Sequence, residues 1–354
     1  MFSRQSSFIT SIVINSRYIP VWLANILLLI AIVLFAPRTL SPTSFSAVLP
    51  LATFLALASL GQMLVIMTGG IDLSVPGTMT LAAMITVGVA SRSDDRLALA
   101  IAVALGVSIV IGLANGLLVG ILKLNALIVT LAVGQVVRGI GIEYAADVAN
   151  EASVPAALSG WATTRFLGAS WIFWVGIAIT VLLALLLRYT VPGRRFQSVG
   201  ANPIAARIAG IHVNFYIVSV YAVAGALYGL AGVLLAGFIR SPTLGLGTPY
   251  LLAPIAAVVI GGASLTGGLA SVPSTWAAAL FLVLLNQMLR VLGMSSALQF
   301  VSFGIAIIGG MVVTGDRIIT VVEHLLRGVA QPDMFAETVP PAAGMPQESE
   351  TSSD

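Results

Sequence analysis

The sequence predicts an all-α polytopic membrane protein with about ten transmembrane helices, in a range of roughly eight to ten, and with an internal repeat. Hydrophobic residues make up 58% of the 354 residues and charged residues only 8%, whereas soluble globular domains carry about 25% charged residues. The chain also contains 35 glycines, which let transmembrane helices pack closely. This composition excludes a soluble enzyme and a nucleic-acid-binding protein. The lack of cysteine in the sequence excludes disulfides and thiolate metal sites.

Charge-free intervals define the expected helices, because a membrane span needs roughly 20 apolar residues. The interval between Arg240 and Arg290 is too long for one helix, and its middle reads Gly261-Gly262-Ala263-Ser264-Leu265-Thr266-Gly267-Gly268, where glycine favours a break. The third expected helix, at 76–90, and the eighth, at 250–266, are short enough to be re-entrant. The ten helices are expected at about 18–36, 46–67, 76–90, 97–122, 125–145, 170–188, 213–238, 250–266, 272–292 and 297–314.

The two ends of the chain are expected in the cytoplasm, flanking a transmembrane domain at residues 18–320. The N-terminus shows no signal-peptide cleavage pattern, because the apolar run from Tyr18 to Ala36 is long enough to span the membrane and no small-x-small site follows it. Residues 321–354 form the other end, and their part from Gln331 to Asp354 contains five acidic residues and no basic one. This acidic tail, rich in Pro, Ser and Ala, is expected to be largely disordered. With both ends inside, nine basic residues lie in cytoplasmic loops and six in external loops, which agrees with the positive-inside rule.

An internal repeat is indicated by features that recur in the same order. Val65–Gly70 corresponds to Val258–Gly262, and Asn115 corresponds to Asn286. Further on, Asn125-Ala126-Leu127 corresponds to Ser296-Ala297-Leu298. The order predicts a duplication of residues 40–145 onto residues 210–314, about a shared pathway as in many transporters.

One cytoplasmic loop, residues 189–212, contains a second pattern. Asn202 is placed to cap a short helix that begins at Pro203, and Gly210 is placed to end it. The apolar side chains on one side of this helix are Ile204, Ile208 and Ile211. Such a helix can lie on the membrane or dock into a groove of a partner, and the pattern alone leaves both interpretations open.

Five motifs follow one another along the chain. They are Thr68-Gly69-Gly70-Ile71-Asp72-Leu73-Ser74-Val75, Asn115-Gly116-Leu117-Leu118-Val119, Ile128-Val129-Thr130-Leu131, the loop from Gly193 to Ile211, and the stretch from Ile255 to Gly268. In this order they resemble the membrane permease subunits of ribose-type ABC sugar importers, within the branched-chain amino acid/ribose permease superfamily. The resemblance covers residues 46–314. It departs from the family pattern at Pro76, usually glycine, and at Leu269-Ala270-Ser271-Val272, which lacks a usual cytoplasmic positive charge.

The resemblance implies a non-enzymatic permease of the bacterial inner membrane that takes up a pentose, a hexose or a related neutral polyol. It implies an ATP-binding subunit that holds ATP and Mg, a periplasmic sugar-binding protein, a second permease copy in a homodimer or heterodimer, and contact with membrane lipid. It implies no cofactor in this chain and no nucleic acid. The sequence agrees, since it contains no Gly-x-x-x-x-Gly-Lys-Ser/Thr phosphate loop.

The residues that the resemblance assigns to docking of the ATP-binding subunit lie in the loop 189–212. Arg207, together with Arg194 and Arg195, can equally serve as a positive-inside anchor. The expected docking residues are Asn202, Ala205, Ala206, Arg207 and Gly210.

The expected pathway residues are mainly uncharged polar or aromatic, because a neutral sugar is bound by amides, hydroxyls and aromatic walls. Polar side chains also bond between transmembrane helices, and both roles stay open. Asp72 either caps the next helix or takes part in substrate contact or gating. Arg138 is expected to snorkel or tie helices together. The pathway and gating candidates are Gln62, Asp72, Asn115, Asn125, Gln135, Asn286, Phe300 and Phe303.

An ion-coupled secondary transporter of a small neutral solute is the alternative. Such a transporter needs carboxylates or histidines within its spans as a relay, whereas His212 and His324 both lie at cytoplasmic boundaries. A membrane enzyme would need a convergent acid–base or metal set within the spans, and the sequence pattern offers none.

Overall fold

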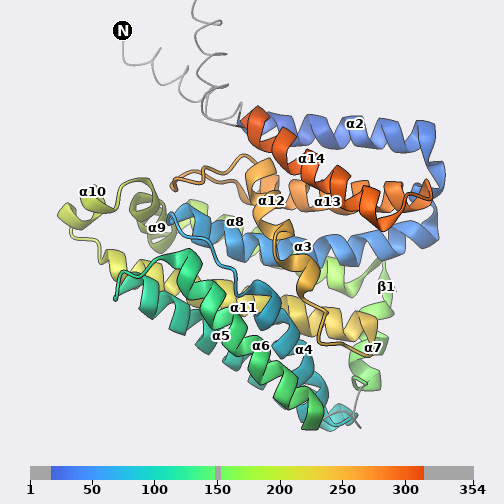
Figure 1. Cartoon of the computed structure of the whole chain (residues 1–354), viewed down its shortest axis with the longest axis horizontal. Helices are drawn as coiled ribbons and strands as arrows, with labels where there is room; N and C mark the ends of the chain where they lie inside the picture. Colours follow the sequence, from blue (N-terminus) through green and yellow to red (C-terminus); the bar gives the residue numbers. More distant parts are fainter. Residues whose placement is uncertain (1–16, 148–152, 315–354) are drawn as a thin grey trace, which may run out of the picture. The chain divides into compact units, whose positions relative to one another are not determined.

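The computed structural model describes residues 17–147 and 153–314. These residues form α-helices joined by short turns and one two-stranded hairpin (Figure 1). Six of the described helices are long and apolar enough to cross a membrane, which confirms the all-α polytopic class. They are α3 (Pro42–Met67), α5 (Leu97–Gly120), α6 (Ala126–Asp147), α8 (Trp171–Tyr189), α11 (Val213–Ile239) and α13 (Val272–Val291).

Four shorter apolar helices stand at the remaining expected positions. Their bounds and those of the long helices mostly lie within four residues of the expected ones. The eighth expected helix is the exception, because it ends at Ile260 rather than at residue 266. Gly262 follows with φ +87°, a left-handed conformation that ends a helix. The shorter helices are α2 (Ile19–Phe35), α4 (Val75–Ala90), α12 (Ala253–Ile260) and α14 (Ser296–Thr314), of which the stretch Ala297–Gly310 counts as the short apolar helix.

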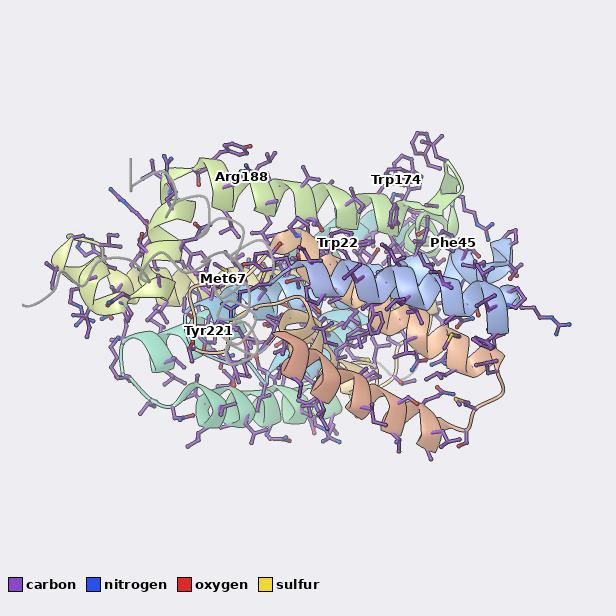
Figure 2. The ribbon with its side chains drawn as sticks, turned by 90° about the horizontal axis from the view of Figure 1, so that it is seen from above. Trp22, Phe45, Met67, Trp174, Arg188 and Tyr221 are labelled. Carbon is purple, nitrogen blue, oxygen red and sulfur yellow. The ribbon has the colours of Figure 1, made fainter. Side chains whose placement is uncertain are left out.

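Short elements lie at the two ends of the helix bundle (Figure 1). One end carries α9 (Val191–Ala201) and α10 (Pro203–Ile208). The opposite end carries α7 (Ala156–Thr163) and an antiparallel hairpin of β1 (Arg165–Phe166) and β2 (Ala169–Ser170), none of which the sequence predicted. Figure 2 shows Arg188 and Trp174 at opposite ends of α8, which connects these two regions. The remaining short elements are the turns η1 (Pro37–Leu40), η2 (Asp94–Arg96) and η4 (Thr248–Tyr250).

The core of the described bundle is formed by α3 and α11. α3 is buried along nearly its whole length and contacts α11, α12, α13 and α8. α11 in turn packs against α5 and α4. The expected chain ends, residues 1–17 and 321–354, lie almost wholly outside the described residues.

α5 and α11 cross in direct backbone contact. A Cβ atom on Gly112 would overlap the carbonyl oxygen of Tyr221, and a Cβ atom on Gly225 would overlap the carbonyl oxygen of Ser108. Small residues allow this approach, as at many transmembrane helix crossings. The close crossing holds the polar residues of α5 and α11 beside the turn between α3 and α4.

Gly225→Ala should lower the melting temperature of the detergent-solubilised protein, because the added methyl group must push α5 and α11 apart. Overpacking of this kind costs about 1–3 kcal/mol. Gly106→Ala in α5 is the matched control, since a Cβ atom there meets no atom within 4 Å. Equal melting temperatures for the two variants would contradict the close crossing.

Candidate functional site

A pocket of about 290 Å³ lies between the start of α4, one face of α6 and the segment that follows α11. Most of its wall is apolar, and its polar side chains are Thr80, Gln135, Arg138 and Thr248. Largely apolar walls with a few polar groups are typical of a small-molecule site. The lining residues are Leu73, Pro76, Gly77, Thr80, Leu81, Leu131, Gly134, Gln135, Val137, Arg138, Gly141, Ile142, Leu244, Gly245, Thr248 and Leu251.

α6 contributes its pocket residues at helical spacing. Leu131, Gln135, Arg138 and Ile142 recur at intervals of three and four residues, so that they share one face. Gln135 and Arg138 are both exposed in the described chain. Because an arginine facing lipid at mid-membrane costs roughly 2.5–3.5 kcal/mol, this face suits water or protein better than lipid. The structure thus places Arg138 in the pocket wall, although the sequence favoured a snorkelling or helix-tying role.

Asp72 lies in the turn between α3 and α4, with only 1% of its surface exposed. Its Oδ1 accepts hydrogen bonds from Ser74 N (2.8 Å) and Ser74 Oγ (2.6 Å). The expected N-cap role is therefore wrong in detail, because Ser74 occupies the N-cap of α4 and Asp72 binds Ser74 rather than the free N–H groups of the helix. Asn115 of α5 joins this group, with its Nδ2 donating to Ser74 Oγ at 2.9 Å and lying 3.5 Å from Asp72 Oδ1.

Side chains from α3 and α6 bind the backbone of the same turn. With the Gln62 amide oriented so that its nitrogen donates to Asp72 O (3.0 Å), its oxygen accepts from Asp72 N (3.1 Å). From α6, Thr130 Oγ1 accepts a hydrogen bond from Leu73 N at 2.9 Å and lies 3.2 Å from Ile71 O. Since Leu73 lines the pocket, these contacts fix one wall of the pocket.

The expected pathway residues separate into different roles. Gln135 lines the pocket, whereas Gln62 and Asn115 are fully buried contacts between helices. Asn125 caps α6, since its Oδ1 accepts from Leu127 N (3.0 Å) and Ile128 N (3.4 Å). Asn286 is half-buried in α13 and does not line this pocket. Phe300 and Phe303 belong to α14, but their side chains lie outside those that the structure describes.

Sequence reasoning missed several pocket residues. Arg138 could have been found, because it follows the candidate Gln135 by three residues and so shares its helix face. Thr80 and Thr248 carry no such signal. Only the fold brings their segments together, because Gly247 N, next to Thr248, donates a hydrogen bond to Thr80 Oγ1 at 3.0 Å across 167 residues.

The short helix α10 agrees with its predicted capping. Asn202 Oδ1 accepts hydrogen bonds from Ile204 N and Ala205 N, both at 3.0 Å. Pro203 is the first helical residue, and Gly210 follows the helix with φ +78°. The expected helix within the loop 189–212 is therefore confirmed.

The exposure of the side chains on α10 agrees with four of the five expected docking residues and disagrees with one. Asn202, Ala205, Arg207 and Gly210 are exposed. Ala206 is only 4% exposed and packs in a cluster with Val199 and Val213, so its side chain faces its own chain and the expectation that it contacts a partner is wrong. The side chains presented outward are instead Ile204 and Ile208, which are 71% and 84% exposed.

Basic groups gather at the same end of the bundle. Lys123, in the turn between α5 and α6, donates to Gly120 O and to Asn214 Oδ1 at the start of α11. Desolvation and the nearby Arg207 guanidinium lower the pKa of Lys123. Arg188, Arg194 and Arg195 lie on the adjoining ends of α8 and α9.

Asp72→Ala should lower the melting temperature, because it leaves the buried Ser74 N–H and hydroxyl without their acceptor. An unsatisfied buried group costs about 1–3 kcal/mol. Asp72→Asn keeps an acceptor oxygen and should melt close to the unaltered protein in the same detergent. An asparagine variant as unstable as the alanine variant would show that the charge, rather than the hydrogen bonds, is required.

The chain is similar to known transport proteins over most of its length. The family model described as "Branched-chain amino acid transport system / permease component" matches residues 44–313. The ribose import permease of Escherichia coli (strain K12) is 33% identical over 303 residues, which cover 83% of this chain and 93% of that protein. The fructose import permease of Rhizobium meliloti is 33% identical over 283 residues, covering 78% and 79% of the two chains.

An autoinducer 2 import system permease of Salmonella typhi is 31% identical over 304 residues, covering 85% of this chain and 86% of that protein. No solved structure is significantly similar to the chain. The family match spans well over half of the chain. The chain therefore belongs to the family of permease components of the branched-chain amino acid transport system type, whose members here include ABC sugar-import permeases.

Proposed function

We propose that this chain forms the membrane pathway of a binding-protein-dependent ABC importer and takes up a pentose, a hexose or a related neutral polyol. The observation that carries the proposal is the pocket between α4 and α6, in a chain whose relatives are named ribose and fructose import permeases. An ATP-binding subunit supplies ATP hydrolysis with its own ATP and Mg. A periplasmic sugar-binding protein delivers the substrate, and a second permease copy completes the pathway.

The chemistry of the pocket suits a polyhydroxylated solute. The Gln135 amide and the Arg138 guanidinium offer several N–H donors to sugar oxygens, and the Thr248 hydroxyl lies in the same wall. Among the described residues that line the pocket, none carries a carboxylate. Leu131, Ile142 and Leu251 supply apolar surface for the C–H faces of a sugar ring.

We assign the end that carries α9 and α10 to the cytoplasm, with the pathway in residues 18–320 and its repeat halves at 40–145 and 210–314. The cluster of Lys123, Arg188, Arg194, Arg195 and Arg207 supports this orientation by the positive-inside rule. Both chain ends, residues 1–17 and 321–354, then lie in the cytoplasm. The chain is a multi-pass protein of the bacterial inner membrane.

We assign the docking of the ATP-binding subunit to α10. Ile204 and Ile208 expose large apolar surfaces beside the exposed Arg207 and Ala205. An apolar helix face of this kind fits a hydrophobic groove on a partner. Asn202 and Gly210 hold the two ends of this helix.

Reconstitution in proteoliposomes tests the proposed function. The permease is co-purified with the ATP-binding subunit and the binding protein encoded beside it, and uptake of labelled ribose, fructose and galactose is measured. Uptake should require ATP and should stop when the Walker lysine of the ATP-binding subunit is replaced by alanine. Uptake driven by a proton or sodium gradient without that subunit would favour the ion-coupled alternative instead.

Gln135→Ala should reduce sugar uptake about ten-fold, because one hydrogen-bonded contact of about 1–1.5 kcal/mol with the substrate is lost. The amount of assembled complex should stay unchanged. Val136→Ala is the matched control, since the neighbouring Val136 is 63% exposed and lies outside the pocket lining. An equal loss of uptake in both variants would contradict the assigned pathway face.

Ile208→Asp should lower the affinity for the ATP-binding subunit about 30-fold, as expected for loss of a central apolar contact of about 2 kcal/mol. The loss is measured by co-purification of the subunit. Leu167→Asp is the matched control, because Leu167 is 78% exposed in the hairpin turn at the opposite end of the bundle. Retention of the subunit by Ile208→Asp would contradict docking on α10.

A further inference from the structure

Three glycine-containing motifs of the sequence meet at one backbone junction. The junction consists of Met67 at the end of α3, Gly200 in the last turn of α9, and Gly267 with Gly268 in the loop after α12. Gly268 N donates a hydrogen bond to Met67 O at 2.9 Å. A Cβ atom on Gly200 would overlap Met67 O, and a Cβ atom on Gly267 would lie 3.0 Å from both Gly200 O and Met67 O. No side chain separates the three backbones at these contacts.

On one side, a short stretch of chain whose backbone is hydrogen-bonded connects the junction to the pocket. Gly69 N donates to Ile66 O (2.8 Å) and Gly70 N to Val65 O (3.2 Å), which form a tight turn after α3. The backbone of the next residues is bound by Gln62 and Thr130. Leu73, which lines the pocket, is therefore joined to Met67 by a short segment whose backbone is hydrogen-bonded at several points.

On the other side, the junction leads to α10. Gly200 lies two residues before Asn202, whose side chain caps α10. Val199 of α9 and Ala206 of α10 share one buried cluster, so the two helices are packed together. A force applied to α10 is therefore delivered to Gly200.

We propose that this junction carries movements of α9 and α10 to the pocket and that Gly200 is a positioning residue for transport. The inference rests on the proposed function, in which α10 docks the ATP-binding subunit and the pocket forms the pathway. Backbone groups in direct contact cannot absorb a displacement by changing rotamer, as a flexible side chain can. Closely packed segments therefore shift together instead of deforming.

Gly200→Ala tests the junction, since its methyl group falls well inside the contact distance of about 3.5 Å and must separate α9 from α3. In proteoliposomes with the ATP-binding subunit and the binding protein, the number of ATP molecules hydrolysed per sugar imported should rise about ten-fold. Co-purification of the ATP-binding subunit should persist. Gly160→Ala is the matched control, because Gly160 also lies within a short helix and a Cβ atom there meets no atom within 4 Å.

If Gly200 has a purely structural role, Gly200→Ala should lower uptake and ATP hydrolysis in the same proportion. An unchanged number of ATP molecules hydrolysed per sugar imported would therefore overturn the inference. If the unaltered complex neither hydrolyses ATP nor imports any of the three sugars, the proposed function fails and takes this inference with it. If the unaltered complex is active and the Gly200→Ala complex hydrolyses the same number of ATP molecules per sugar imported, the inference is overturned but the proposed function stands.

A cross-link gives a second, independent measurement if Gly200→Ala does not fold. A Cβ atom on Gly268 would lie 3.5 Å from Ala201 Cβ, within the range for a disulfide, and the sequence contains no other cysteine. The oxidised Ala201→Cys, Gly268→Cys double variant should import sugar as well as its reduced form, because the joined segments move together. Gly268 has φ +84°, a conformation that strains a cysteine, so the reduced double variant is the reference for the oxidised one. Loss of uptake that a reductant restores would overturn the inference.

Discussion

Within a membrane, backbone polar groups have no water to bond, so that every interruption of a helix must be satisfied by protein. The turn between α3 and α4 is such an interruption. Gln62 bonds the N–H and the carbonyl of Asp72, Thr130 accepts from Leu73 N, and Asp72 in turn accepts from Ser74. The arrangement of α3, α4, α5 and α6 around this turn follows from the need for these partners.

The same requirement links two regions that the sequence keeps far apart. The turn carries Leu73, which lines the pocket, and it begins at Met67, whose carbonyl accepts from Gly268. The close crossing of α5 and α11 at Gly112 and Gly225 lies one helical turn from Asn115, whose amide donates to Ser74 Oγ in the turn. The carbonyl of Met67 also packs against Gly200 of α9, so that a pocket wall and a contact with α9 belong to one hydrogen-bonded segment.

The sequence predicted the helices well and the roles of polar side chains poorly, for one physical reason. Long apolar runs and glycine breaks are local signals, and the capping of α10 by Asn202 is equally local. Gln62 instead bonds the backbone of Asp72 and, in the same orientation, donates to the hydroxyl of Tyr228 at 3.2 Å, 166 residues away. The burial of Ala206 depends on Val213 of the next helix. The glycines from Gly261 onward predicted a break, but the expected helix extended to residue 266, whereas α12 ends at Ile260, before the left-handed Gly262.

Most hydrogen bonds that stabilise the turn between α3 and α4 are made to main-chain atoms. This has a consequence for how the substrate specificity of such a protein can change in evolution. Gln62 and Thr130 bind N–H and carbonyl groups that every non-proline residue possesses. Side chains in the pocket wall, such as Leu73 and Leu131, can then change without disturbing the supports of the wall. A scaffold of this kind separates selection on folding from selection on cargo, so that new specificities are reached by few substitutions. Relatives named for ribose, fructose and autoinducer 2 show the breadth of cargo in one family.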